Sequence, residues 1–412
     1  MTKISPQLKK IWTVAMVLYI ICSSAFSYGD LRMLNTYALY FFLGVSAFCI
    51  LVKAKVKLNA TVLCLVLYAV IMLIGAMYTP ATEKSVTRVL YAYGTMMVLA
   101  VCFVQYIETI EDVKGIFTAY MWAGLALAIY VYAQHGSQLW LYLRQNVGAD
   151  ETDINRLGND MVDANTIGLY TAVSVLIASF KVIFEKERIW KKILYVAIIV
   201  FCFVIDMASA SKKGLLLLAI GAVGIWLYNA LGSKNVLKQL RNLVFLGALG
   251  IVLFFVITRI PIFSGIAVRI ESFFGTVSGD SGNASDELRM NMIRNGLTVW
   301  LQHPLFGAGT ASSSYYFGVY AHNNYVEMLM NSGTIGFAVF YIPQIIAVCE
   351  LFAYQKTCKA SSKYAILAFA LLFSVLTCGF GLVYYYERYF MILVVVVAAV
   401  PKLAKAQPII DK

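Results

Sequence analysis

The sequence predicts an all-α, polytopic membrane protein with about 12 transmembrane helices. Apolar residues make up 61% of its 412 residues, whereas charged residues make up only 13%. A soluble globular domain carries about a quarter charged residues, so this composition excludes that class. Apolar runs of about 20 residues, enough to cross a bilayer as a helix, recur along the whole chain. We therefore expect residues 1–412 to form a single integral membrane domain.

Each expected span follows from one of these apolar runs. Lys3, Lys9 and Lys10 precede the first run, an arrangement that also occurs in signal peptides. We favour an uncleaved first span, because the later loops then orient consistently with both chain ends inside. The expected spans cover residues 11–28, 33–52, 60–78, 86–106, 115–134, 165–184, 192–208, 213–230, 241–259, 323–352, 364–383 and 388–401.

The basic charge of the chain is explained by its distribution. The net charge is +12, and most Lys and Arg residues fall in segments that share one side if the spans alternate. This is the positive-inside pattern of a polytopic protein, so the charge does not call for a nucleic-acid partner. On the inner side, the turn around Glu108, Glu111 and Asp112 is the segment that departs from the pattern.

The outer side nevertheless carries cations at its helix ends and loops. A cationic outer basin that attracts a polyanionic ligand explains them together. The alternative is that several snorkel or pair locally with Asp206, Glu271, Asp286, Glu287 or Glu387, and for Arg32, Arg294 and Arg388 this alternative is at least as good. The outer cations are Arg32, Arg88, Arg156, Lys212, Lys213, Arg269, Arg289, Arg294 and Arg388.

Two long extracytoplasmic loops are expected, at residues 135–164 and 259–322, and the second is the candidate catalytic loop. Within it, Ser285 and the two acidic residues after it predict a helix start. Apolar residues then recur at helical spacing until Pro304 ends the run. This pattern predicts a short amphipathic helix on the membrane surface, with Arg289 on its first turn. Gly307 and Gly309 follow, which predicts a flexible turn where backbone approaches a ligand.

His322 opens the tenth span, with Asn323 and Glu327 four residues apart on one helix face. A neutral histidine beside cations that lower its pKa can act as a general base toward a sugar hydroxyl. The alternative is that His322 merely caps the helix; its setting in an arginine-bearing outer loop favours the base. With 3 histidines in the chain and no H-E-x-x-H pattern, we expect no metal site and no cofactor.

Two further outer motifs place charge at helix starts. Residues 155–165 carry Arg156 and end in Asn165 just before the sixth span. Residues 209–214 place Lys212 and Lys213 at the start of the eighth span, where backbone N–H groups also favour phosphate.

In their order and sidedness, these segments resemble the O-antigen polymerase and O-antigen ligase superfamily, the Wzy/WaaL type. The similarity rests on Arg289, Trp300, residues 303–309, residues 322–327 and residues 333–336. Residues 155–165 are similar to the family's R-x-x-G…N segment, and residues 211–214 to its S-R-[K/G] segment. The resemblance covers roughly the C-terminal two-thirds of the chain.

The resemblance implies a GT-C-like, metal-independent glycosyltransferase of the bacterial cytoplasmic (inner) membrane, acting on the periplasmic or extracellular side. Its donor would be a glycan linked through diphosphate to undecaprenol, and its acceptor a sugar hydroxyl. The lipid tail needs an apolar groove, and we expect Gly333 and Gly336 to bend or thin the tenth span for it. Membrane lipids and a chain-length regulator protein are further candidate partners.

By the same resemblance, His322 would deprotonate the acceptor hydroxyl while Arg289 and Lys212 hold the leaving diphosphate. The family usually has arginine where this chain has Lys212, and lysine neutralises a phosphate without gripping it bidentately. Arg269 competes with Arg289 for its role. The remaining diphosphate-binding candidates are Lys213, Arg156 and Arg88, and the supporting candidates are Asn323, Glu327 and Asn165.

The leading hypothesis is a polymerase that joins repeat units into O-antigen, capsule or exopolysaccharide. A ligase that passes a finished glycan to lipid A-core or to a protein has the same motifs. A lipid-linked sugar flippase or other transporter is less favoured, because few charges lie in mid-span and no internal repeat is visible. A purely structural membrane protein leaves the outer cations unexplained.

Overall fold

The computed structural model describes residues 4–27, 29, 31–139, 142, 156–157, 162–231, 235–259, 268, 284–357 and 362–405. All regular structure in these residues is helical, and every span expected from the sequence coincides with a helix. The helices are α1 (Pro6–Ala25), α2 (Arg32–Lys53), α3 (Ala60–Gly75), α4 (Glu83–Tyr106), α5 (Ile110–His135), the 3-10 helix η1 (Gly136–Gln138), α7 (Ala164–Phe184), α8 (Ile189–Ser209), α9 (Lys212–Leu231), α10 (Val236–Arg259), α12 (Ala284–Gln302), α13 (Ser312–Phe317), α14 (Asn324–Thr357), α15 (Ser362–Cys378) and α16 (Arg388–Lys405).

The chain is a polytopic membrane protein. Within the described residues, 8 helices are long and apolar enough to cross a membrane, namely α1, α2, α4, α5, α7, α8, α9 and α14. Two shorter apolar helices, Ala60–Gly75 and Lys363–Cys378, correspond to two further expected spans.

Local sequence explains where several helices begin. Ser5 caps α1 ahead of Pro6, and Asn59 caps α3 through its side chain. Thr109 and Asp112 form a reciprocal capping box at the start of α5. The amphipathic helix expected from Ser285 is α12, which begins one residue earlier and ends at Gln302, two residues before Pro304. Pro304 ends it as expected because the residue before a proline disfavours helical backbone.

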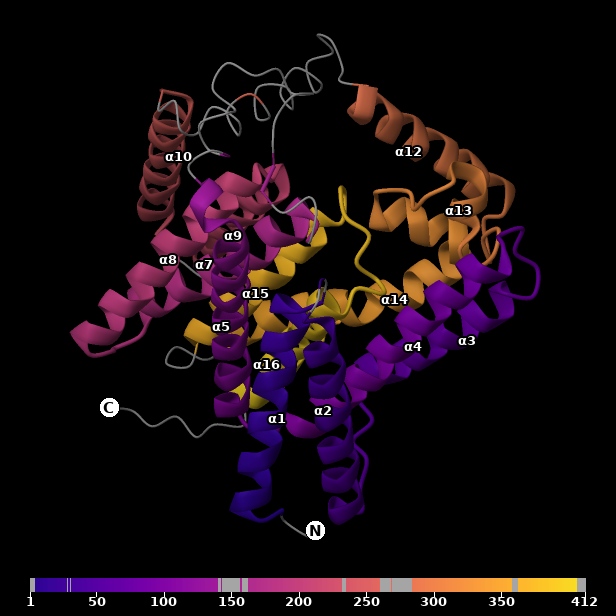
Figure 1. The fold of residues 1–412 in the computed structure, drawn as a ribbon, viewed down its shortest axis with the longest axis horizontal. Helices are drawn as coiled ribbons and strands as arrows, with labels where there is room; N and C mark the ends of the chain where they lie inside the picture. Colours follow the sequence, from indigo (N-terminus) through magenta and orange to yellow (C-terminus); the bar gives the residue numbers. More distant parts are fainter. Residues whose placement is uncertain are drawn as a thin grey trace.

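Two groups of helices make up the core. α7 packs against α5, α8 and α9, and it is the most buried of the 8 candidate spans, with 78% of its apolar window buried. α14 crosses the centre of the molecule and packs against α3, α12 and α16 (Figure 1). The N-terminus of α14 directly follows the loop expected at residues 259–322.

The acidic turn between α4 and α5 is paired with lysines from neighbouring helices. Lys9 Nζ lies 3.0 Å from Asp112 Oδ1, and Lys53 Nζ lies 2.7 Å from Glu108 Oε1. The other inner segments are rich in lysine and arginine, whereas this turn is acidic. The ion pairs explain the difference, because Asp112 and Glu108 neutralise lysines at the ends of adjacent helices.

α14 is interrupted at Gly333, whose backbone angles are φ 63° and ψ −168°. The break exposes backbone groups that the preceding loop satisfies. Thr334 N–H donates to the Pro304 carbonyl at 2.8 Å, and Ala308 N–H donates to the Met330 carbonyl at 2.7 Å. The expected bend in this span is therefore confirmed, and its physical cause is the left-handed glycine.

The loop itself does not form the expected flexible turn. Gly307 and Gly309 have φ of +71° and +99°, and a side chain on Gly307 would meet the backbone of Gly333. Residues 307–313 are buried. The prediction that these glycines bring backbone close to a ligand is wrong: they bring the loop close to α14 and α3. Gly336 likewise packs against Tyr68 of α3, so protein, and not a lipid groove, occupies this side of the bend.

Candidate active site

His322 precedes α14 and leaves the capping of that helix to its neighbour. The Asn323 side-chain oxygen accepts from the N–H groups of Tyr325 at 3.0 Å and Val326 at 3.1 Å. This is the hydrogen-bond pattern of an N-cap residue. The alternative that His322 merely caps the helix is therefore wrong, and its imidazole remains available for chemistry.

Glu327 holds the backbone immediately before His322. Its carboxylate accepts from Ala321 N–H at 2.6 Å, from Ser313 Oγ at 2.7 Å and from Asn331 Nδ2 at 3.2 Å. The residue is only 2% exposed. Because a buried carboxylate needs several donors, this network is a rigid anchor, and Glu327 supports the position of His322 through the chain.

The surroundings of His322 favour its neutral form. Burial, followed by the positive charges of Arg289 and Lys213, lowers the pKa of the imidazole from 6.5 to about 4. Its ring lies 4.2 Å from the ring of Tyr320, centroid to centroid. At neutral pH the imidazole is unprotonated and can accept a proton.

The structure brings Lys213 to this site. Lys213 acts electrostatically on His322, and Arg289, Asp163 and Arg156 lie within electrostatic reach of Lys213. Lys212, the residue that matches the family motif, is half-buried and is not among the charges that act on His322. His322, Arg289 and Lys213 thus converge from the loop before α14, from α12 and from α9.

Arg156 joins the ends of two other helices. Its Nε donates to the Ser209 carbonyl at 3.2 Å, and one terminal nitrogen donates to Asn165 Oδ1 at 3.1 Å. The backbone next to Arg156 is also bound to the end of α8, because Leu157 N–H donates to the Ala208 carbonyl at 3.2 Å. Asn165 therefore helps to place Arg156.

The helix starts beside the site have their own side-chain caps. Asp163 Oδ1 accepts from the N–H groups of Asn165 at 3.0 Å and Thr166 at 3.1 Å, at the start of α7. Ser211 Oγ accepts from Gly214 N–H at 3.3 Å, at the start of α9. Part of the N–H capacity that was expected to favour phosphate at α9 is therefore already used.

Other candidate cations stand apart from His322 or outside the described residues. Arg88 is exposed on α4, where its charge acts on Tyr386. Arg294 is exposed on α12. Arg269 lies outside the described residues, so its competition with Arg289 stays open.

The idea that Asp206 pairs with an outer cation is wrong. Asp206 is fully buried, and neither of its carboxyl oxygens has a hydrogen-bond partner in the part of the chain that the structure describes. A built Cβ on Gly168 or Gly214 would meet its side chain, so glycines on α7 and α9 make room for it.

The connection between α15 and α16 is a part of the site that the sequence did not indicate. Asn324 N–H donates to the Gly379 carbonyl at 2.8 Å, and Asn323 Nδ2 donates to the Phe380 carbonyl at 3.2 Å. The Asn324 side-chain oxygen accepts from Tyr384 N–H at 2.8 Å and Tyr385 N–H at 3.0 Å. The paired asparagines after His322 were the available signal, since a buried amide needs this many partners.

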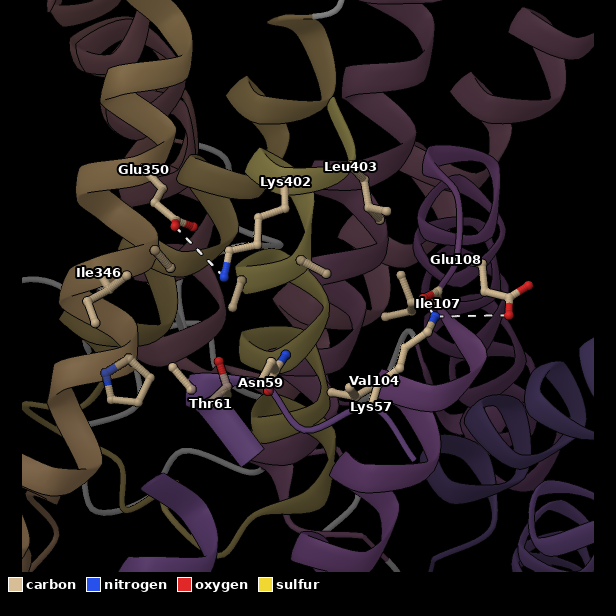
Figure 2. A pocket seen from close by; sticks show the side chains of 15 residues that line it. Lys57, Asn59, Thr61, Val104, Ile107, Glu108, Ile346, Glu350, Lys402 and Leu403 are labelled. Atoms are coloured by element: carbon tan, nitrogen blue, oxygen red, sulfur yellow. Dashed lines mark hydrogen bonds and ion pairs between the residues drawn. The ribbon is translucent and has the colours of Figure 1, made fainter. Parts of the chain in front are cut away.

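One cavity lies at the opposite end of α14 and α16 from His322 (Figure 2). It measures about 210 Å³ and is lined by charged residues that are already paired. Lys402 lies 3.9 Å from Glu350, and Lys57 lies 4.0 Å from Glu108. This cavity is therefore separate from the candidate active site. Among the described residues, no three His, Cys, Asp or Glu side chains group closely enough to hold a metal ion.

Fold and site together define a multi-pass helical membrane protein in which a neutral imidazole and cations meet beside one set of helix ends. Residues 196–341 match the Wzy_C family model, described as O-Antigen ligase. This segment belongs to that family, runs from α8 into α14 and includes Lys213, Arg289 and His322. The resemblance seen in the sequence is confirmed. The matched family consists of O-antigen ligase- and polymerase-type membrane enzymes of surface polysaccharide synthesis, and the match implies lipid-linked glycan substrates. The comparison with curated proteins found no match.

Proposed function

We propose that this protein is a membrane glycosyltransferase that polymerises undecaprenyl-diphosphate-linked repeat units into a surface polysaccharide. The observation that carries the proposal is the convergence of a neutral imidazole at His322 with the positive charges of Arg289 and Lys213. A base and a set of cations are the two functions that displacement of a lipid diphosphate by an alcohol requires.

In the proposed reaction, His322 accepts the proton of the acceptor hydroxyl. The freed oxygen attacks the anomeric carbon of the donor sugar, and the bond from that carbon to the diphosphate breaks. Arg289 and Lys213 stabilise the negative charge that gathers on the departing lipid diphosphate, which carries away the bonding electron pair. The imidazolium then returns its proton to solvent or to the diphosphate.

We infer twelve membrane crossings, with both chain ends in the cytoplasm of a bacterium and the catalytic loop, residues 259–322, on the outer side of the inner membrane. The twelve helices that coincide with the expected spans support this number. Successive crossings then place the start of α14, the end of α8 and the start of α9 on the same side, where lipid-linked glycans are joined.

A ligase is the second candidate, because the description of the matched family is O-Antigen ligase. In that case the same base and cations would transfer a finished glycan to lipid A-core or to a protein. The donor chemistry is unchanged, so the acceptor alone separates the two functions.

Incubation of the purified protein with lipid-linked repeat units as the sole substrate tests the proposal. A polymerase yields a ladder of products that differ by one repeat unit, because each unit serves as donor and acceptor. A ligase yields product only when lipid A-core or an acceptor protein is added. Absence of transfer under both conditions, with folded protein, refutes a glycosyltransferase.

A further inference from the structure

A second cavity of about 460 Å³ lies between the ends of α1, α2 and α16, and α4 and α7 also line it. Its volume falls within the range of about 300–1,000 Å³ typical of small-molecule sites. The end of α16 that contributes Glu387, Arg388 and Tyr389 follows the same connection that holds Asn323 and Asn324 beside His322. The cavity therefore neighbours the candidate active site without containing its base.

Tyr386 lies between the two places. Burial raises the pKa of its hydroxyl, and the negative charges of Glu327 and Glu387 raise it further. Glu327 anchors the backbone before His322, whereas Glu387 lines the cavity. Tyr386 thus lies within electrostatic reach of both acids, and the turn that contains it also binds Asn324 through the N–H groups of Tyr384 and Tyr385.

The lining of the cavity combines donors, acceptors and aromatic faces. Arg32, Asn35 and Thr36 contribute from the first turns of α2, and Tyr389 contributes from α16. The Tyr389 ring stacks on Tyr170 of α7, with centroids 3.7 Å apart and planes at 12°. Asn35 Oδ1 is buried and has no hydrogen-bond partner within the described residues.

A buried polar atom without a partner is costly unless something else satisfies it. A lipid tail offers no such groups, and a diphosphate offers acceptors but no C–H face for the tyrosine rings. A sugar ring has both: its hydroxyls donate and accept, and its C–H faces pack on aromatic rings. The lining therefore matches a saccharide best.

We propose that this cavity is a saccharide subsite that holds sugar units of the acceptor glycan while the acceptor hydroxyl lies at His322. The assignment to the acceptor rests on the proposed function, which gives the donor diphosphate to Arg289 and Lys213. Glu387 in the lining follows Tyr385 by two residues, and Tyr385 N–H donates to Asn324 beside His322, so the turn before α16 connects the cavity to the site that the acceptor must reach.

The test is a binding experiment on the purified full-length protein. The probe is oligosaccharide fragments, released by partial acid hydrolysis from the surface polysaccharide of the organism that encodes this chain. The substitution Thr36→Trp fills the cavity from α2, and Tyr37→Trp is its matched control, because Tyr37 is 61% exposed on the same helix and does not line the cavity. Isothermal titration measures the Kd.

We expect Thr36→Trp to raise the Kd at least tenfold, a loss of about 1.4 kcal/mol, while Tyr37→Trp binds like the wild type. Asn35→Leu, which removes the unpaired acceptor at similar size, should also weaken binding and serves if Thr36→Trp does not elute as folded protein. Wild-type binding by both cavity variants overturns the proposal.

The two proposals fail in different ways. If the wild type binds fragments in this cavity but transfers no glycan from lipid-linked units, the proposed function is lost and the saccharide site remains. If the wild type makes polymer while Thr36→Trp and Asn35→Leu bind fragments and extend chains normally, the function remains and the cavity assignment is lost.

Discussion

His322 has a backbone conformation that side chains rarely adopt, with φ of 55°. A residue other than glycine in this left-handed region costs roughly 1–2 kcal/mol. The neighbours supply the compensation: Asn323 caps α14, and Glu327 binds Ala321 N–H. Strain at a residue with a chemically competent side chain, held in place by its own neighbours, supports a functional role for that residue.

Replacement of His322 by alanine should lower the rate of glycan transfer roughly 100- to 10,000-fold, the usual contribution of a general base. His303 is the matched control, because it is exposed at the end of α12 and lies outside the cluster. His303→Ala should transfer glycan like the wild type. The measurement is the initial rate of product formation from lipid-linked units. Equal rates in all three proteins would exclude His322 as the base.

The two adjacent lysines differ in a way that pH can reveal. A cation disfavours the imidazolium form, so loss of the Lys213 charge should raise the pKa of His322 from about 4 toward 6.5. Burial, the larger cause, persists, so the shift should be partial. Activity of Lys213→Met should therefore disappear at a higher pH on acidification than wild-type activity does.

Lys212→Met is the control for this shift, since Lys212 does not act on the imidazole. The acid limb of kcat/KM against pH measures the free enzyme. An upward shift of that limb in Lys212→Met and not in Lys213→Met would transfer the role to Lys212, the residue indicated by the family motif.

At the scale of elements, the site depends on the loop that docks into the break of α14. A Cβ at Gly333 would overlap the Leu305 carbonyl, and the φ of +63° is itself unfavourable for alanine. Gly333→Ala should destabilise the protein by about 1–3 kcal/mol. Thermal unfolding in detergent measures the loss.

Gly115→Ala is the comparison, because a Cβ there meets nothing within 4 Å and Gly115 lies inside α5. Alanine in an open helical position should leave stability unchanged or raise it by about 0.5–1 kcal/mol. If the two variants unfold at the same temperature, the docked loop does not hold α14 in its bent form.

The elements themselves were largely predictable, because apolar runs, caps and Pro304 act locally. The docking was not predictable. The bond from Thr334 N–H to the Pro304 carbonyl joins residues 30 positions apart, and no periodic pattern reports a backbone contact of this kind. The same limit applies to Gly307 and Gly309. Their backbone conformation could be predicted from the sequence, but the sequence did not show that the loop backbone contacts α14 and α3 and not a ligand.

At the scale of the whole molecule, sidedness is the property to measure. In a chain whose 8 native cysteines are replaced by alanine, a single cysteine at Glu83 should react with a membrane-impermeant thiol reagent added to intact spheroplasts. A single cysteine at Lys55 should react only after the membrane is opened. Both positions are exposed in the structure. The reverse pattern would place His322 in the cytoplasm and remove the proposed function.

The site was predictable in its residue types and its order along the chain, but only in part in its membership. Lys212 and Lys213 are adjacent on a helix, so their side chains point about 100° apart around the helix axis. The sequence does not show which of the two faces His322. The α15–α16 connection also escaped prediction, because nothing local in residues 379–386 indicates that they surround the start of α14.

The side-chain caps at α7, α9 and α14 have a consequence for what the enzyme can accept. Where the backbone N–H groups at a helix start have no side-chain cap, they can bind an anion directly, and their positions are fixed by the backbone. Here Asp163, Ser211 and Asn323 occupy such amides, so the diphosphate of the proposed reaction would be held chiefly by the flexible side chains of Arg289 and Lys213. Because these long side chains can adjust their conformation, such a site should tolerate headgroups of different size.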